Sequence, residues 1–136
     1  MSNDKIETLK KVPLFSRCSK KELEFLAGEM DEARVPAGSV LLQEGASGQG
    51  FYIVLDGEVE VTKGGKHRRD LGSGQFFGEI SMIDRGPATA TVTAKTPLRV
   101  LVLSHRQFAD AIRANHELSL LVMESMASRL REDPPS

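Results

Sequence analysis

The spacing of hydrophobic residues changes twice along the chain, and each spacing predicts a different secondary structure. Near the start, apolar residues recur at the spacing of one helix face, at Leu23, Leu26, Ala27 and Met30. Between residues 39 and 104 they occur in short runs separated by glycine, proline or charged residues, which is typical of strands. Helical spacing returns after residue 104. The pattern predicts helical ends around a β-structured middle.

Capping signals mark where three helices begin. Ser19 is followed three residues later by Glu22, and Ser104 by Gln107. This is the capping-box pattern, in which each side chain bonds the backbone N–H of the other residue. Asn115 can cap a further helix. That last helix carries a broad set of apolar residues: Leu118, Leu121, Val122, Met123, Met126 and Leu130.

The middle of the chain has the turn residues that a sheet protein needs. Of the 12 glycines, only Gly28 lies outside the stretch from Gly38 to Gly86. Gly64 and Gly65 between two lysines predict a type I′ hairpin, because both central residues need a positive φ. The predicted strands cover residues 39–43, 51–55, 59–62, 68–71, 89–94 and 99–104. We therefore expect a mainly β fold, a β jelly-roll barrel with an N-terminal helical segment and two C-terminal helices.

Length and composition narrow the possibilities further. A chain of 136 residues fits one domain, with N-terminal helices over 1–30, the jelly roll over 31–103, C-terminal helices over 104–131 and a tail over 132–136. Eighteen basic and 19 acidic residues lack the basic surplus of a nucleic-acid binder. A single cysteine, which cannot form an internal disulfide, predicts a cytoplasmic protein, and no apolar run is long enough to span a membrane.

Residues with catalytic chemistry do not form a convincing set. The three histidines, His67, His105 and His116, lack the spacing of a metal site. Arg17 and Lys20 beside Cys18 would lower the thiol pKa, although a packed or surface cysteine is far more common. We expect no enzyme activity, no catalytic residue, no metal and no cofactor.

One segment, residues 75–92, has the features of an anion site. Gly78 allows the backbone to approach a ligand closely, and a short helix starting after it would present unpaired N–H groups. Glu79 would repel a phosphate but can accept hydrogen bonds from sugar hydroxyls. The segment therefore indicates a nucleotide or sugar-phosphate site. A simple turn of the barrel at Gly78 and Glu79 explains these two residues equally well.

This segment resembles the phosphate-binding cassette of the cyclic-nucleotide-binding domain family. That family includes catabolite-activator-type regulators, protein kinase A regulatory subunits and nucleotide-gated channels. The stretches 38–45 and 51–61 match the family as well. The resemblance extends from Leu14 to the C-terminal helices and implies a β jelly roll flanked by helices.

The resemblance assigns roles to individual residues. It implies that the backbone amides of Gly78, Ile80 and Ser81 hold the cyclic phosphate. It also implies that Glu79 binds the ribose 2′-hydroxyl. Thr89 matches a position near the phosphate that favours guanine in some members, although threonine also simply suits a strand.

The arginine with which the family binds the phosphate falls at Ala88, so this chain lacks it. A hydrogen bond to a charged group contributes about 1.5–3 kcal/mol, so its loss should weaken binding about ten- to a hundredfold. Arg85 is the nearest substitute, but a solvated loop role explains it as well. Arg68 and Arg69 are expected on a solvated face.

The resemblance implies a regulatory module for cAMP or cGMP in signal transduction. Because the chain ends soon after the last helices, we expect a stand-alone sensor that acts on an unknown effector protein. The apolar C-terminal helix predicts a homodimer, although packing on the barrel must account for part of its surface. The alternative is a degenerate domain that binds no cyclic nucleotide and acts as an interaction or dimerisation scaffold.

Overall fold

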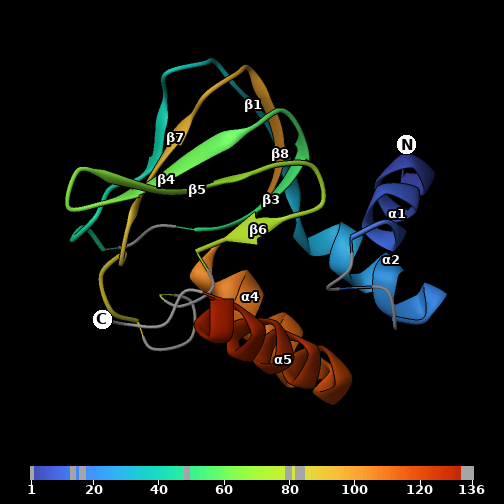
Figure 1. The fold of residues 1–136 in the computed structure, drawn as a ribbon. Coiled ribbons are helices and arrows are strands. Elements are labelled where there is room, and N and C mark those ends of the chain that lie inside the picture. The colour runs from blue at the N-terminus through green and yellow to red at the C-terminus, as the bar shows by residue number, and fades with distance from the viewer. Residues whose placement is uncertain are drawn as a thin grey trace. The chain divides into compact units, whose positions relative to one another are not determined.

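The chain forms two compact units in the computed structural model. The structure describes residues 2–12, 15, 18–47, 50–78, 81 and 85–132. One unit combines residues 1–28 with residues 110–136, and the other consists of residues 29–109. The first unit is helical, and the second holds the strands (Figure 1).

Three of the described helices begin directly after the capping residues that the sequence predicts. The helices are α1 (Ser2–Lys10), α2 (Lys20–Glu29), α4 (His105–Ala114) and α5 (His116–Glu132). Before α2, the Glu22 N–H donates to Ser19 Oγ at 3.2 Å, and the Ser19 N–H donates to Glu22 Oε1 at 2.7 Å. The same pair of bonds joins Ser104 and Gln107 before α4. Both capping boxes are confirmed.

The third cap also connects two helices within the first unit. The Leu118 N–H donates to Asn115 Oδ1 at 3.0 Å, so Asn115 caps α5 as expected. The Asn115 side-chain amide also donates to the Glu22 carboxylate. One asparagine therefore ties the start of α5 to the start of α2.

The second unit is built from two antiparallel sheets of four strands each. In chain order the strands are β1 (Asp31–Val35), β2 (Val40–Leu42), β3 (Phe51–Asp56), β4 (Val59–Lys63), β5 (Lys66–Leu71), β6 (Phe76–Phe77), β7 (Thr91–Ala94) and β8 (Leu98–Leu103). The first sheet has the order β1-β8-β3-β6, and the second has the order β2-β7-β4-β5. The mainly β class with flanking helices is confirmed.

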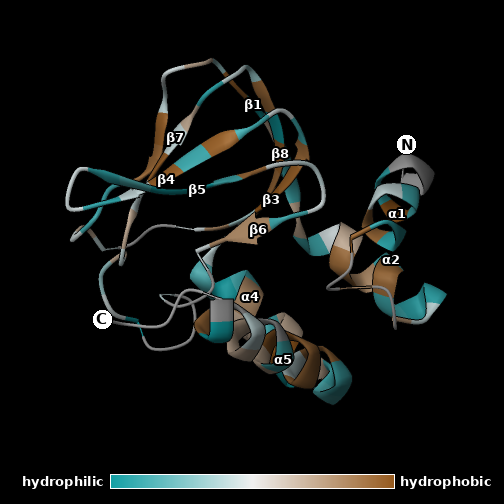
Figure 2. Cartoon of the chain, viewed as in Figure 1, coloured by the Kyte–Doolittle hydropathy of each residue, from teal (hydrophilic) through white to brown (hydrophobic). Residues whose placement is uncertain are grey.

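The core of this unit lies between the two sheets. Val54, Phe77 and Val100 of the first sheet form one buried cluster with Val59 and Val92 of the second. Each strand contributes alternate residues, because successive side chains of a strand point to opposite faces. Figure 2 shows the consequence as mixed hydrophobic and hydrophilic colouring along β4, whereas β5 is mostly hydrophilic.

Local turn chemistry decides the hairpin between β4 and β5. Gly64 and Gly65 have φ angles of 60° and 79°, which is the arrangement that the type I′ prediction requires. β1 was not expected from the sequence, because three of its five residues are charged and it shows no apolar run. β6 has only two residues and corresponds to the apolar strand end that the sequence indicates before Gly78.

Candidate functional site

The turn at Gly78 is fixed by a close approach between two backbones. Gly78 follows β6 and has a φ of +93°. A Cβ atom at this position would lie 2.4 Å from the Gly50 carbonyl oxygen and 3.3 Å from Phe51 Cα. Glycine is therefore required here by the start of β3, independently of any ligand. The close approach seen here is between Gly78 and the protein's own backbone, and the predicted approach of a ligand to Gly78 remains a prediction.

An aromatic pair holds the strand that leads into this turn. The rings of Tyr52 on β3 and Phe77 on β6 stack with centroids 5.0 Å apart and an angle of 14°. Burial raises the pKa of the Tyr52 hydroxyl. Because Phe77 immediately precedes Gly78, the stack fixes the direction in which the chain enters the candidate site.

Ala88 lies on the inside of the second unit. Its side chain is 5% exposed and belongs to the apolar cluster between the sheets. Its N–H donates to Ala46 O at 2.9 Å, and its carbonyl accepts from the Gly45 N–H at 2.9 Å. The next residue, Thr89, is exposed. A side chain at position 88 is therefore directed inward, but alanine provides no charge there.

The loop between Gly78 and Ala88 is described only in part. The Arg85 N–H donates to the Ser81 carbonyl at 3.0 Å, which is the bond that closes one helical turn. Arg85 is exposed, and its φ of 61° is uncommon for a residue other than glycine. Glu79 and Ile80 lie outside the described residues, so their predicted contacts with ribose and phosphate remain predictions.

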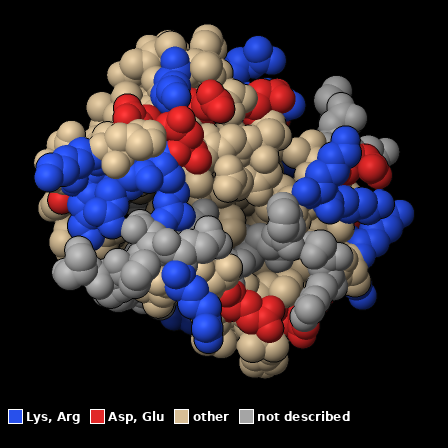
Figure 3. All heavy atoms as spheres, in the orientation of Figure 1, with Lys and Arg blue, Asp and Glu red and all other residues tan. Residues whose placement is uncertain are grey.

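The hairpin between β4 and β5 carries a concentration of positive charge. Figure 3 shows Lys and Arg side chains gathered over the region where β4 and β5 lie in Figure 1. The hairpin and β5 contain Lys63, Lys66, Arg68 and Arg69. Part of this charge is balanced, since Asp70 accepts a 2.9 Å bond from Lys95 Nζ. An anion approaching this face meets a favourable field.

Arg69 does not have the solvated position that its sequence context suggests. It pairs with Val61, and it lies two residues before the buried Leu71 on the same face of β5. That face is the inner one, because Val61 packs against the buried cluster and Leu71 belongs to it. Arg69 is accordingly half-buried. Arg68 is the extra residue at the bulge and is exposed.

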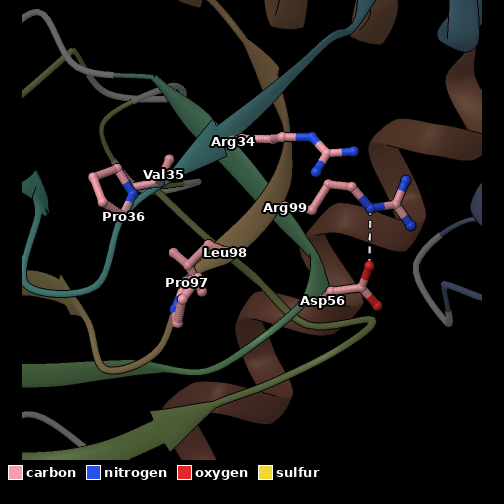
Figure 4. A pocket seen from close by; sticks show the side chains of 7 residues that line it. All are labelled: Arg34, Val35, Pro36, Asp56, Pro97, Leu98 and Arg99. Carbon is pink, nitrogen blue, oxygen red and sulfur yellow. Dashed lines mark hydrogen bonds and ion pairs between the residues drawn. The ribbon is translucent and has the colours of Figure 1, made fainter.

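A separate hollow lies elsewhere on the second unit. Its volume is about 470 Å³. Arg99 Nε donates to Asp56 Oδ2 at 2.9 Å beside it (Figure 4). The hollow is lined by Arg34, Val35, Pro36, Asp56, Pro97, Leu98 and Arg99. Not one of these residues belongs to the site that the sequence predicts, so the hollow and the candidate site are different places.

The Cys18 thiol was the nucleophile candidate that the sequence offered. Burial, together with Glu22 and Glu117, raises the pKa of the Cys18 thiol to about 11, which is opposite to the expected effect of Arg17 and Lys20. A half-buried thiol with a raised pKa is a poor nucleophile. Within the described part of the chain, no three His, Cys, Asp or Glu residues cluster as metal ligands would, and no helix is long and apolar enough to cross a membrane.

A comparison with protein families identifies the family to which this chain belongs. The family profile described as "Cyclic nucleotide-binding domain" matches residues 32–115, which is more than half of the chain. The chain belongs to this family. The matched range covers nearly all strands and the loop that contains Gly78 and Ala88.

Individual relatives of this cyclic nucleotide-binding domain are regulatory proteins. The cAMP-dependent protein kinase regulatory subunit of Yarrowia lipolytica is 39% identical over 102 residues, which are 74% of this chain and 27% of that protein. The catabolite activator protein of Thermus thermophilus has a TM-score of 0.80 at 29% identity, with 88% of this chain and 59% of that chain covered. This chain spans about a quarter of the length of the curated relatives it matches.

One structural neighbour shows that the fold also occurs without cAMP dependence. The regulatory subunit of a cAMP-independent protein kinase A from Trypanosoma brucei has a TM-score of 0.82 at 24% identity. The match covers 96% of this chain and 46% of that chain. This likeness concerns the fold alone, so the ligand must be argued from the residues of this chain.

Proposed function

We propose that this domain is a cyclic-nucleotide sensor, a regulatory module for cAMP or cGMP that performs no catalysis. Membership of the cyclic nucleotide-binding domain family carries the proposal. The regulatory subunits among the relatives are named for cAMP, and another relative is a cGMP-dependent protein kinase. The protein would change conformation on binding and act through an effector protein.

In this proposal the phosphate sits at the turn that begins at Gly78. The amides of Gly78, Ile80 and Ser81 donate to its oxygens, and Glu79 accepts from the ribose 2′-hydroxyl. Thr89 is placed at the edge of the same site. Support comes from the packing of Gly78 against Gly50, which fixes the first residue of the turn and so reduces the ordering needed on binding.

The absence of an arginine at position 88 sets the expected strength of binding. Backbone amides alone should hold a singly charged phosphate about ten- to a hundredfold more weakly than amides plus arginine. Ala88 is directed inward from a backbone fixed by two hydrogen bonds. We therefore expect Ala88→Arg to bring a guanidinium into the site and to tighten binding.

Calorimetric titration with cAMP and with cGMP tests this function. The matched variants are Ala88→Arg and Thr89→Arg, which add the same charge to neighbouring positions with opposite exposure. We expect measurable heat with the natural chain and tighter binding for Ala88→Arg only. An absence of heat at millimolar nucleotide for both proteins would contradict the proposal and leave the interaction scaffold as the function.

We also propose that the chain forms a homodimer through α5. Leu120, Met123 and Leu130 are 45%, 57% and 54% exposed. Together with Ala127 they are spaced three and four residues apart, which is the spacing of a coiled-coil seam. Analytical ultracentrifugation should show a dimer for the natural chain and a monomer for Met123→Lys. Glu124→Lys, next to the seam, should leave the dimer intact.

A further inference from the structure

Arg69 interrupts an apolar row on the inner face of the second sheet. The register of this sheet aligns Leu42 with Val92, Val92 with Val61, and Val61 with Arg69. Side chains that pair across adjacent strands point to the same face of a sheet. Leu42 and Val92 are buried, and Val61 packs against them. The fourth member of the row is a guanidinium, at the edge strand β5.

Placing this charge inward has a physical cost. A half-buried charged side chain loses part of its hydration, whereas Asp70 and Arg68 on the same strand are exposed. Inward charges on edge strands can serve to prevent edge-to-edge association. Arg69 also has an interaction within the protein, so an edge-protecting role is the explanation against which a binding role must be tested.

The path of the chain brings Arg69 opposite the turn at Gly78. Between β5 and β6 the chain crosses from the second sheet to the first through a tight turn, where the Gln75 N–H donates to Gly72 O at 3.0 Å. Arg69 lies three residues before this turn, and Gly78 lies three residues after it. At about 3.3 Å per residue, both lie about 10 Å from the crossing, on sheets that pack about 10 Å apart.

The long side chain of an arginine can reach across the space between the two sheets. A phosphate bound at the Gly78 turn would lie within its reach. Arginine carries its charge at the end of a flexible stem, and the planar guanidinium offers paired donors to phosphate oxygens. The side chain of Ala88 points into the same interior. Arg85, the nearest candidate substitute in the sequence, is exposed, as its alternative role in a solvated loop implies.

We propose that Arg69 supplies the positive charge that pairs with the phosphate of the bound nucleotide, in place of an arginine at position 88. This inference rests on the proposed function. It assigns phosphate recognition to an inward residue of β5 on the sheet facing the Gly78 turn. The cation then reaches the anion from the opposite sheet, not from the loop that holds it.

Nucleotide affinities of matched variants test the proposal. Arg69→Met keeps an apolar stem and removes the charge, and Arg68→Met makes the same change one residue away at the exposed bulge. We expect Arg69→Met to weaken cAMP and cGMP binding alike, by about ten- to a hundredfold. Arg68→Met should change affinity less than threefold, because only the general field is reduced. Ala88→Arg added to Arg69→Met should restore affinity.

The other outcomes separate the possible failures. Binding by Arg69→Met equal to that of the natural chain overturns the inference while the sensor function stands. A loss confined to one nucleotide also overturns it, because Arg69 would then recognise the base. If the natural chain binds neither nucleotide, the sensor function itself is wrong and this inference falls with it. Should Arg69→Met fail to fold, Arg69→Gln makes the same comparison with a polar side chain.

Discussion

The backbone contact behind Gly78 can be tested by adding one methyl group. Gly78 and Gly38 have nearly the same backbone angle, with φ values of +93° and +90°. A Cβ at Gly78 would meet the Gly50 carbonyl oxygen at 2.4 Å, whereas a Cβ at Gly38 would meet no atom within 4 Å. Replacing each glycine by alanine therefore applies the same backbone strain with and without a steric conflict.

The expected changes in the free energy of unfolding follow from the backbone strain and from the steric conflict. A left-handed backbone costs a non-glycine residue about 1–2 kcal/mol, so Gly38→Ala should destabilise the protein by about that amount. Gly78→Ala adds an overpacking cost of about 1–3 kcal/mol, because the atom in conflict is backbone and cannot rotate away. The total for Gly78→Ala is then about 2–5 kcal/mol.

The chain provides its own probe for this measurement. It has one tyrosine and no tryptophan, and Tyr52 stacks on the residue before Gly78. Urea unfolding followed by Tyr52 fluorescence therefore reports on the unit that contains both glycines. If Gly78→Ala lowers the free energy of unfolding no more than Gly38→Ala does, then Gly78 does not lie as close to the Gly50 carbonyl as the structure shows.

Three further predictions concern the rest of the molecule. Asn115→Ala removes a helix cap and the bond to Glu22, and it should lower the free energy of unfolding in urea by about 1 kcal/mol or more. Cys18, whose pKa is raised to about 11, is almost entirely protonated at pH 8, so iodoacetamide should label it much more slowly in native protein than in urea; equal rates would contradict the burial. Asp70→Asn breaks an exposed pair with Lys95 and should leave the melting temperature nearly unchanged, because exposed ion pairs contribute little to stability; a clear drop in the melting temperature in calorimetry would show that the pair is not merely a surface contact.

The features predicted correctly from the sequence depend on residues that are neighbours in the chain. Ser19 and Glu22 are three residues apart, so the geometry of a helix start brings them together wherever the helix lies. Gly64 and Gly65 determine their turn in the same way. The family resemblance of the segment from Gly78 to Thr89 belongs here too, because a contiguous loop shows its motif directly in the sequence.

The features that were missed depend on strand pairing and on residues far apart in the chain. Arg69 was expected in solvent because the residues before it are all charged or polar, and only the pairing with Val61 and the bulge at Arg68 place it inside. Cys18 was expected beside cations, but burial and two carboxylates decide its pKa, one of them about a hundred residues away in sequence, at Glu117. Neither effect has a local signature.

The sequence by itself determined the helix starts, the hairpin turn, the mainly β class and the loop that resembles a phosphate site. Those features follow from short-range hydrogen bonds and backbone preferences, which act between residues a few positions apart. Tertiary structure alone decided that Gly78 is held against Gly50, that Ala88 faces the interior and that Arg69 faces the same interior from the other sheet. A shift of one residue in strand register reverses which side chains face inward, so these placements exist only once the two sheets have formed.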